Sequence, residues 1–183
     1  MPGLGGQALG RMGASVQNLP GAEVYQALAS GAIDGTEWIG PWADEKAGFQ
    51  EITKFYYTAG MHEPAAGLSL ATNLDVFESL SPAHQKIIEI AAGEAHQWNL
   101  GQFMNNNGAA LQRLQAGGVK VLEFPDSVWD AMGTAAIETM DQYNGDDIYD
   151  RIRASYTASM AASSGWITQS EGAYRGQRDR VMG

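Results

Sequence analysis

Two carboxylates stand at the ends of segments that the sequence predicts to be β-strands. Glu37 lies within GTEWIGPW at residues 35–42, and Glu63 follows the aromatic segment KFYYTAG at residues 54–60. Because α/β proteins place their sites at strand ends, these two residues admit three interpretations. They could bind a hard cation through their oxygen atoms, act as general acid and base across a scissile bond, or be ordinary surface residues, which is the default for any single Glu.

Aromatic side chains near the same strand ends favour a ligand site around Glu37. They are Trp38, Trp42, Phe55, Tyr56 and Tyr57. A cavity lined by aromatic residues with few polar groups is the usual form of a ligand pocket. Burial in the core is the alternative, and we prefer it for Phe55 and for one of the two tyrosines.

Catalytic motifs are incomplete in this sequence. His62 precedes Glu63, but no second His follows at the spacing of the H-E-x-x-H zinc motif. Ser69 has no G-x-S-x-G frame, and His84 and His96 share no metal-binding face of their predicted helix. The chain contains no cysteine, so disulfides, thiolate zinc sites and a cysteine nucleophile are excluded. No complete catalytic constellation results.

Length and charge narrow the class of protein further. The 183 residues suffice for one domain and at most one and a half, and 44% hydrophobic residues can form a core. With 21 acidic and 11 basic residues the net charge is −10, which argues against a nucleic-acid partner because such a partner requires a basic face. No run of about 18 apolar residues is present, so the sequence predicts no membrane span.

Hydrophobic spacing and helix-start signals predict a helix-rich chain. Ser81 and Pro82 form a strong helix start, and the helix that follows runs to Gly117 unless residues 105–108, three Asn and a Gly, break it in two. Other helices are expected at residues 7–12, 23–30, 126–140 and 148–162, whereas the tail from residue 163 shows little periodicity.

Four short segments are expected to be strands. They lie at residues 36–39, 54–60, 66–72 and 119–124. The sum indicates an α/β or α+β fold. The strands are too few and too scattered for a complete open sheet, so we expect some of them to pair with sequence outside this chain.

Several stretches resemble one family, the solute-binding proteins of tripartite ATP-independent periplasmic (TRAP) transporters. The similar stretches are PGLGGQALGRMGA, EVYQALASGAIDG, TEWIGPWAD, KFYYTAGMHEP and LSPAHQKIIEIAAGEA, in that order along the chain. TEWIGPWAD and the MHEP turn look most like the subgroup that binds 2-oxo acids and related monocarboxylates with a metal ion. The resemblance covers almost the whole chain.

The resemblance implies an α/β, periplasmic-binding-protein-like fold with two lobes around a cleft. It implies that this chain is the C-terminal half, an incomplete helix-rich fragment with long C-terminal helices. Residues 1–60 would be part of the second ligand-binding lobe, and residues 61–183 would hold the crossing strands, a long bracing helix and the C-terminal helices. A periplasmic location is implied, with a signal peptide expected in the full-length protein and absent from this chain.

The resemblance also implies the ligands of a cation. By motif, Glu37, Trp38 through its carbonyl, and Glu63 hold a sodium or calcium ion that bridges to a small carboxylate, with His62 beside that ligand. The family's carboxylate-clamping arginine normally lies just before the PGLGG turn, where this chain has only Met1. A bidentate, charge-assisted anchor is therefore missing, and we expect this chain alone to bind ligand weakly or not at all.

The implied partners are a small carboxylate ligand and the membrane subunits of the transporter. In some similar proteins a long terminal helix is exchanged between two subunits. Trp166, Ile167 and Tyr174 need burial, either in the partner of a homodimer or against the missing lobe. The leading hypothesis is thus extracytoplasmic capture of a carboxylate. A hydrolase or lyase that uses Glu37 and Glu63 is the alternative.

Overall fold

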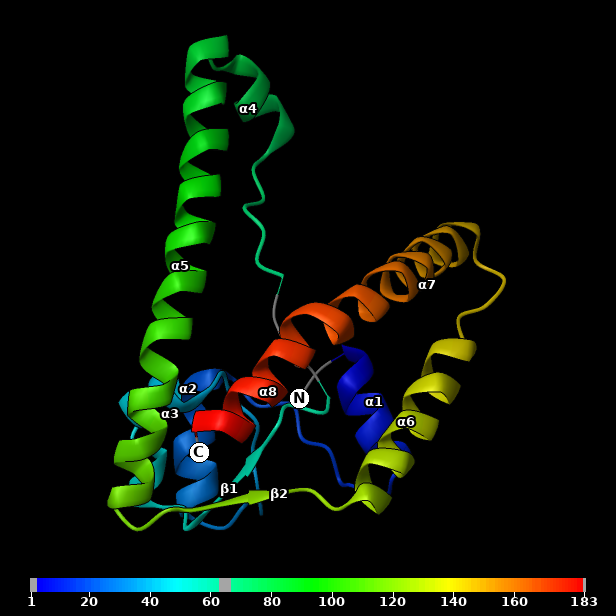
Figure 1. The fold of residues 1–183 in the computed structure, drawn as a ribbon. Helices are drawn as coiled ribbons and strands as arrows, with labels where there is room; N and C mark the ends of the chain where they lie inside the picture. The colour runs from blue at the N-terminus through cyan, green and yellow to red at the C-terminus, as the bar shows by residue number, and fades with distance from the viewer. Residues whose placement is uncertain (1–2, 63–66, 183) are drawn as a thin grey trace. The chain divides into compact units, whose positions relative to one another are not determined.

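The computed structural model describes residues 3–62 and 67–182 (Figure 1). Contacts divide the chain into two units, Met1–Ala135 and Ala136–Gly183. Both are dominated by helices, as the sequence predicts. The expected lobe boundary at residue 60 concerns the whole protein and stays a prediction.

The first unit contains helices, a short 3-10 helix and two strands. In chain order they are α1 (Gly3–Arg11), α2 (Gly21–Ala29), α3 (Pro41–Lys46), η1 (Phe49–Glu51), β1 (Phe55–Thr58), α4 (Leu74–Ser79), α5 (Pro82–Ala116), β2 (Lys120–Glu123) and α6 (Asp126–Asp141), whose last turns pass into the second unit. A small core between α1 and α6 buries Ala8, Met132 and Ala135.

The strands predicted at residues 54–60 and 119–124 are confirmed as β1 and β2. They pair in parallel, with Tyr56 opposite Val121. The other two predicted strands are wrong where the structure describes them, because residues 36–39 and 67–72 are irregular. An apolar run becomes a strand only if a neighbouring strand takes its backbone hydrogen bonds, and the Ile39 amide donates instead to a side chain, that of Asp44.

Helix α5 begins where the sequence predicts. The Ser81 hydroxyl accepts a hydrogen bond from the His84 amide at 3.3 Å, and Pro82 occupies the first turn. The possible break at residues 105–108 does not occur, since the helix is continuous over 35 residues. Asn side chains disfavour helices by competing for backbone groups. Here Asn106 donates to the Gln102 carbonyl, one turn earlier, and stays within the helix.

Helix α3 packs against the C-terminal half of α5 (Figure 1). The rings of Trp42 and Phe103 meet edge to face with centroids 5.3 Å apart. Arg113 donates to both oxygens of Glu45 at 2.8 and 2.6 Å, and this hydrogen bonding holds the pKa of the Glu45 carboxyl below its usual value. The fork of an arginine fixes the direction of its partner as well as its distance.

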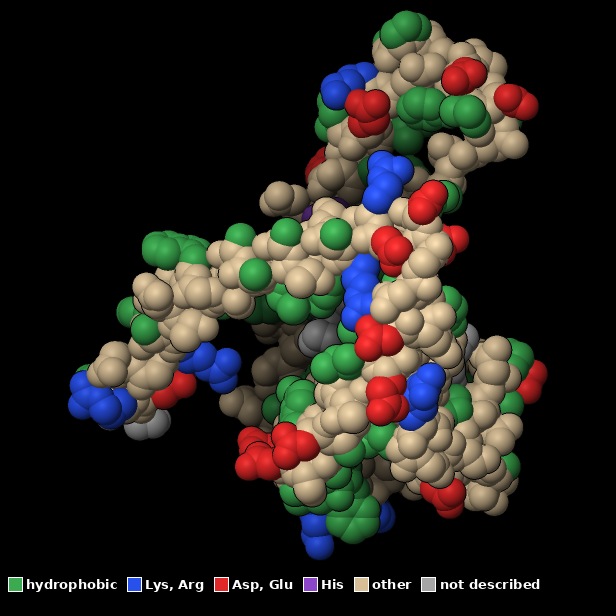
Figure 2. Space-filling view, turned by 90° about the vertical axis from the view of Figure 1, so that its right-hand side faces the viewer, with side chains coloured by type: hydrophobic (Ala, Val, Ile, Leu, Met, Phe, Trp, Pro, Cys, Tyr) green, Lys and Arg blue, Asp and Glu red, His purple; other side chains and the backbone are tan. Residues whose placement is uncertain are grey.

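Large apolar side chains remain exposed over much of the chain, and the face drawn in Figure 2 shows such side chains open to solvent. On α5 they are Ile87, Ile90, Trp98, Leu100 and Met104. Where such side chains form a contiguous patch, the patch is typical of a protein, membrane or ligand contact. None of the helices in the described residues combines the length and apolarity needed to span a membrane.

The second unit continues the chain as helix to its end. Helix α7 (Asp147–Ile167) is followed by a π-helical turn, η2 (Thr168–Gly172), and by α8 (Ala173–Met182). The helix predicted at residues 148–162 is confirmed. The tail beyond it is also helical despite its weak periodicity, and an ion pair between Arg175 and Asp179, one turn apart, lies on its surface. Asp146 caps α7 by accepting from the Tyr149 amide at 2.8 Å.

Candidate functional site

The segment that carries Glu37 and Trp38 is an irregular loop between α2 and α3. It ends at Gly40, which precedes Pro41 in the first turn of α3. Gly40 has φ of 151°, a backbone conformation that favours glycine, and a β-carbon there would lie 3.5 Å from the Asn107 amide oxygen. The same oxygen accepts the Trp42 amide at 3.1 Å, so α5 fixes the point where the loop enters α3.

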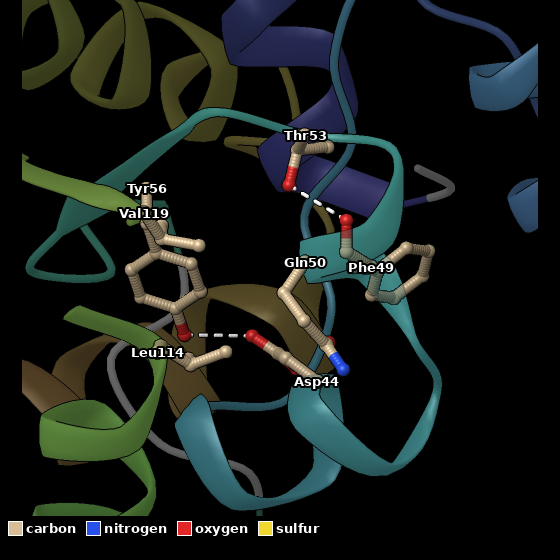
Figure 3. Close-up of a pocket in the computed structure, with 7 residues that line it drawn as sticks. All are labelled: Asp44, Phe49, Gln50, Thr53, Tyr56, Leu114 and Val119. Carbon is tan, nitrogen blue, oxygen red and sulfur yellow. Dashed lines mark hydrogen bonds between the residues drawn. The ribbon is translucent and has the colours of Figure 1, made fainter. Parts of the chain in front are cut away.

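The buried carboxylate of Asp44 holds the loop that carries Glu37 and Trp38 through hydrogen bonds to its backbone. Asp44 is 7% exposed and accepts the backbone amides of Ile39 and Gly40 at 3.1 and 2.9 Å. Its second oxygen accepts the Tyr56 hydroxyl of β1 at 2.6 Å, and Figure 3 shows the two side chains meeting. Burial, together with the hydrogen bond to Asp44, raises the pKa of Tyr56, so its phenol stays a donor at neutral and alkaline pH.

The small cavity in Figure 3 belongs to this support and is not a ligand site. Its volume is about 10 Å³. It is lined by Asp44, Phe49, Gln50, Thr53, Tyr56, Leu114 and Val119. A ligand pocket for a small molecule is at least an order of magnitude larger.

The Trp38 side chain packs rather than reaching for a ligand. Its ring meets Phe49 edge to face with centroids 5.6 Å apart. It also covers Gly21 at the start of α2, where a β-carbon would lie 3.2 Å from the indole. Phe49 is buried and stacks in turn on Tyr25 of α2. The indole thus anchors the loop, and the Trp38 carbonyl is the group that could coordinate a cation.

Glu37 and His62 are brought together although they lie far apart in the sequence. The carboxylate oxygen and the imidazole Nε2 are 3.6 Å apart, with side chains 36% and 19% exposed respectively. Glu63, the other predicted carboxylate ligand, lies outside the described residues. Within residues 3–62 and 67–182, no group of three His, Asp or Glu side chains is close enough to hold a metal ion.

The aromatic residues expected around Glu37 do not form one pocket. Trp42 packs against α5, with the Lys46 ammonium 4.0 Å above its ring, and Tyr57 stacks on Phe124 at 4.6 Å. Tyr56 is the tyrosine that turns inward. The expectation that Phe55 is a core residue is wrong: this side chain is 58% exposed. Alternation along β1 puts Tyr56 on the inner face and its two neighbours outside.

Sequence reasoning missed the residues that hold the loop: Asp44, Asn107 and Arg113. For Asp44 a signal was present, because an acidic residue three positions after a first-turn proline can reach back to the amides that precede a helix. Asn107 and Arg113 act across more than 60 positions of sequence, and no local pattern reveals such a contact.

The donor atoms suit a hard cation. A carboxylate and a backbone carbonyl offer oxygen only, which is the ligand set of calcium and sodium and not that of zinc or copper. A bound ion would neutralise the acidic loop and allow an anionic ligand to approach it.

Comparison with solved structures places the fold among TRAP transporter solute-binding proteins. The protein from Bordetella bronchiseptica matches all of this chain with a TM-score of 0.94 and 32% identity, and its structure is a mixed-occupancy dimer with calcium and picolinate in one site and an apo site. The protein from Pseudoalteromonas atlantica, with bound sodium and pyruvate, matches 95% of this chain with a TM-score of 0.88 and 34% identity.

The chain belongs to family 7 of the bacterial extracellular solute-binding proteins, the DctP family, whose model matches residues 2–146. A monocarboxylate 2-oxoacid-binding periplasmic protein of Nostoc is 44% identical over 131 residues, or 72% of this chain. The predicted fold class and family are therefore confirmed. The enzyme alternative finds no support, because the family is described as extracellular solute-binding proteins and the Nostoc relative as a periplasmic binding protein.

This chain spans only part of the length of these relatives. It covers 55% of the Bordetella chain, 54% of the Pseudoalteromonas chain and 36% of the Nostoc protein.

Proposed function

We propose that this chain supplies the cation-binding part of the ligand site in a TRAP transporter solute-binding protein for small 2-oxo monocarboxylates. The observation that carries the proposal is the partly open Glu37 carboxylate, 3.6 Å from His62, on a loop whose Trp38 carbonyl is a second oxygen donor. Glu63 completes the proposed cation ligands, and His62 lies beside the bound carboxylate.

The ligands of the relatives share one chemical feature that supports this ligand class. Pyruvate and picolinate each carry a second donor atom, a keto oxygen or a ring nitrogen, on the carbon next to the carboxylate. Both donors of such a molecule can chelate one cation. A cation held by Glu37 and Trp38 would therefore select acids with a donor next to the carboxylate over simple fatty acids.

The proposed function is tested by calorimetry on the whole protein with pyruvate and with propionate, which lacks the keto oxygen. We expect pyruvate to bind with micromolar affinity when Ca²⁺ or Na⁺ is present. Propionate should bind about 100-fold more weakly, a loss of about 2.7 kcal/mol. Removal of Ca²⁺ with EGTA in a choline buffer should abolish pyruvate binding. Equal affinity with and without the cations would contradict the proposal.

Delivery to the membrane subunits is the second part of the proposed function. Binding proteins of two lobes close around their ligand by a hinge motion, and a membrane partner can distinguish the closed form from the open one. Loaded protein would then dock on the transporter and release the carboxylate there.

A homodimer through the C-terminal helix is a further part of the proposal. On α7 an exposed apolar stripe repeats every four residues: Ile148, Ile152, Tyr156 and Met160. Residues at this spacing share one face of a helix. Trp166 is also 72% exposed. A second copy is the occupant we propose for this surface, and the dimeric Bordetella structure supports that choice.

Light scattering on the whole protein tests the dimer. We expect a dimer mass for the wild type and a monomer mass for Ile152→Asp, because the charge would be buried in an apolar interface. Ala154→Asp adds the same charge on another face of α7 and should remain dimeric. A wild-type monomer at every concentration would contradict the proposal and assign the stripe to contacts within one subunit.

A further inference from the structure

Asp44 is a buried charged residue that the proposed function does not use. It is 7% exposed, so it is closed to a cation in solvent, and all of its described partners are donors from the protein itself. Two of them are backbone amides of the loop that carries Glu37 and Trp38. Asp44 therefore acts on that loop and not on the ligand.

The hydrogen bond from Ile39 reaches the candidate cation ligand through a single peptide group. The Ile39 amide and the Trp38 carbonyl belong to the same planar unit, which is trans here. In a trans peptide the N–H and C=O groups point in opposite directions. By holding the Ile39 amide at 3.1 Å, Asp44 directs the Trp38 carbonyl oxygen away from itself and fixes its orientation.

The same contact strengthens the carbonyl as a ligand. A negative acceptor on the N–H side of a peptide draws the amide proton and increases the negative charge on the oxygen, as in other hydrogen-bond chains. Within residues 3–62 and 67–182, no hydrogen-bond donor contacts the Trp38 carbonyl oxygen. The neighbouring Glu37 carbonyl, in contrast, accepts the Thr36 hydroxyl at 3.0 Å.

Tyr56 holds the Asp44 carboxylate in the position from which it orients the Ile39 amide. Its hydroxyl donates to the other oxygen of Asp44 at 2.6 Å, so the plane of the carboxylate is held between β1 and the loop (Figure 3). Tyr56 itself is held by the register of β1 on β2, opposite Val121. A continuous path thus runs from the sheet through Tyr56 and Asp44 to the Trp38 carbonyl.

We propose that Asp44 is a positioning residue that orients and polarises the Trp38 carbonyl toward a hard cation such as Ca²⁺, and that Tyr56 holds Asp44 in this role. The inference rests on the proposed function, in which Trp38 is a cation ligand. It adds two residues that never touch the ion but set its affinity and its coordination.

The test measures both affinity and coordination in the whole protein. Tb³⁺ takes the place of Ca²⁺, and energy transfer from the Trp38 indole excites its emission when the ion is bound nearby. Competition with Ca²⁺ gives the affinity, and the ratio of emission lifetimes in H₂O and D₂O reports how much water the bound ion carries. A merely structural residue would not change that water content.

Two conservative variants separate the contributions. Asp44→Asn removes the charge, and we expect Ca²⁺ affinity to fall about 10-fold to 100-fold, as for other partners that orient metal ligands. Tyr56→Phe removes only the hydroxyl and should lower the affinity by a smaller factor. In both, the bound Tb³⁺ should gain water because the Trp38 carbonyl no longer points steadily at it. Tyr149→Phe deletes another part-buried tyrosine hydrogen bond, from the Tyr149 hydroxyl to the Met140 carbonyl at 2.8 Å, and should change neither quantity.

Three results would decide against the inference. Unchanged affinity and hydration in both variants, with wild type binding Ca²⁺, would overturn it and leave the proposed function standing. Weaker binding without added water, in step with a lower unfolding midpoint, would also overturn it by giving Asp44 a structural role only. If the wild type bound neither Ca²⁺ nor Tb³⁺, the proposed function itself would fail and the inference with it.

Discussion

Glu37→Gln in the whole protein is expected to lower the affinity for the cation, and with it for pyruvate, by roughly 100-fold, or about 2.7 kcal/mol. Glutamine keeps the length of the side chain and one carbonyl oxygen, so packing is retained. It loses the negative charge that attracts a hard cation and the second oxygen that can coordinate it. The pairing with His62 at 3.6 Å weakens as well.

Calorimetry with Ca²⁺ alone and with Ca²⁺ plus pyruvate measures both losses. The matched control is Glu78→Gln, which makes the same change on the exposed surface of α4. Its affinities should equal those of the wild type. If Glu37→Gln also kept wild-type affinity for the cation, Glu37 would be an ordinary surface residue, and the proposed site would lie elsewhere.

Phe49→Ala is expected to destabilise the protein by about 3 kcal/mol, within the range measured for large aromatic residues in protein cores. Phe49 is 8% exposed and contacts two other aromatic rings, Tyr25 and Trp38. Its removal leaves a cavity under the Trp38 indole, which anchors the loop that carries Glu37 and Trp38. Cation affinity should therefore fall together with stability, although Phe49 does not touch the proposed ion.

Urea unfolding of the whole protein compares this variant with Phe55→Ala. Phe55 has the same side chain but is 58% exposed on β1, so its loss should cost no more than about 0.5 kcal/mol. Similar midpoints for the two variants would show that the cluster of Phe49, Tyr25 and Trp38 is not a core.

The sequence predicted the elements whose signals are local. Ser81 and Pro82 predicted the start of α5, because a helix cap acts within one turn. The alternation of apolar and polar residues at 119–124 predicted β2. The strand at residues 36–39 was wrong for a physical reason: its apolar residues fit a strand, but the Ile39 amide is taken by Asp44 and not by another strand. Whether a strand forms depends on a partner that its own residues do not specify.

The candidate site was predicted only in part, for the same reason. Glu37 and His62 were named from their types and from the family resemblance, and the structure brings them together. The supports of the site act over distance, as Asn107 does when it binds the Trp42 amide across 65 positions of sequence. In the sequence Asn107 looks like any other residue of a helix. Its contact with the Trp42 amide can be recognised only once the fold brings α5 next to α3.

The parallel pairing of β1 with β2 has a consequence for the order of folding. Thr58 and Leu122, which meet across this pair, are 64 positions apart, and all of α5 lies between them. Helix α5 can form early from local contacts, whereas the two strands can pair only after the chain has run the length of that helix, about 52 Å at 1.5 Å per residue. Tyr56 lies on β1, so it reaches its place only when the two strands pair. We therefore expect the hydrogen bond from Tyr56 to Asp44, which supports the loop of Glu37 and Trp38, to form late in the folding of this unit.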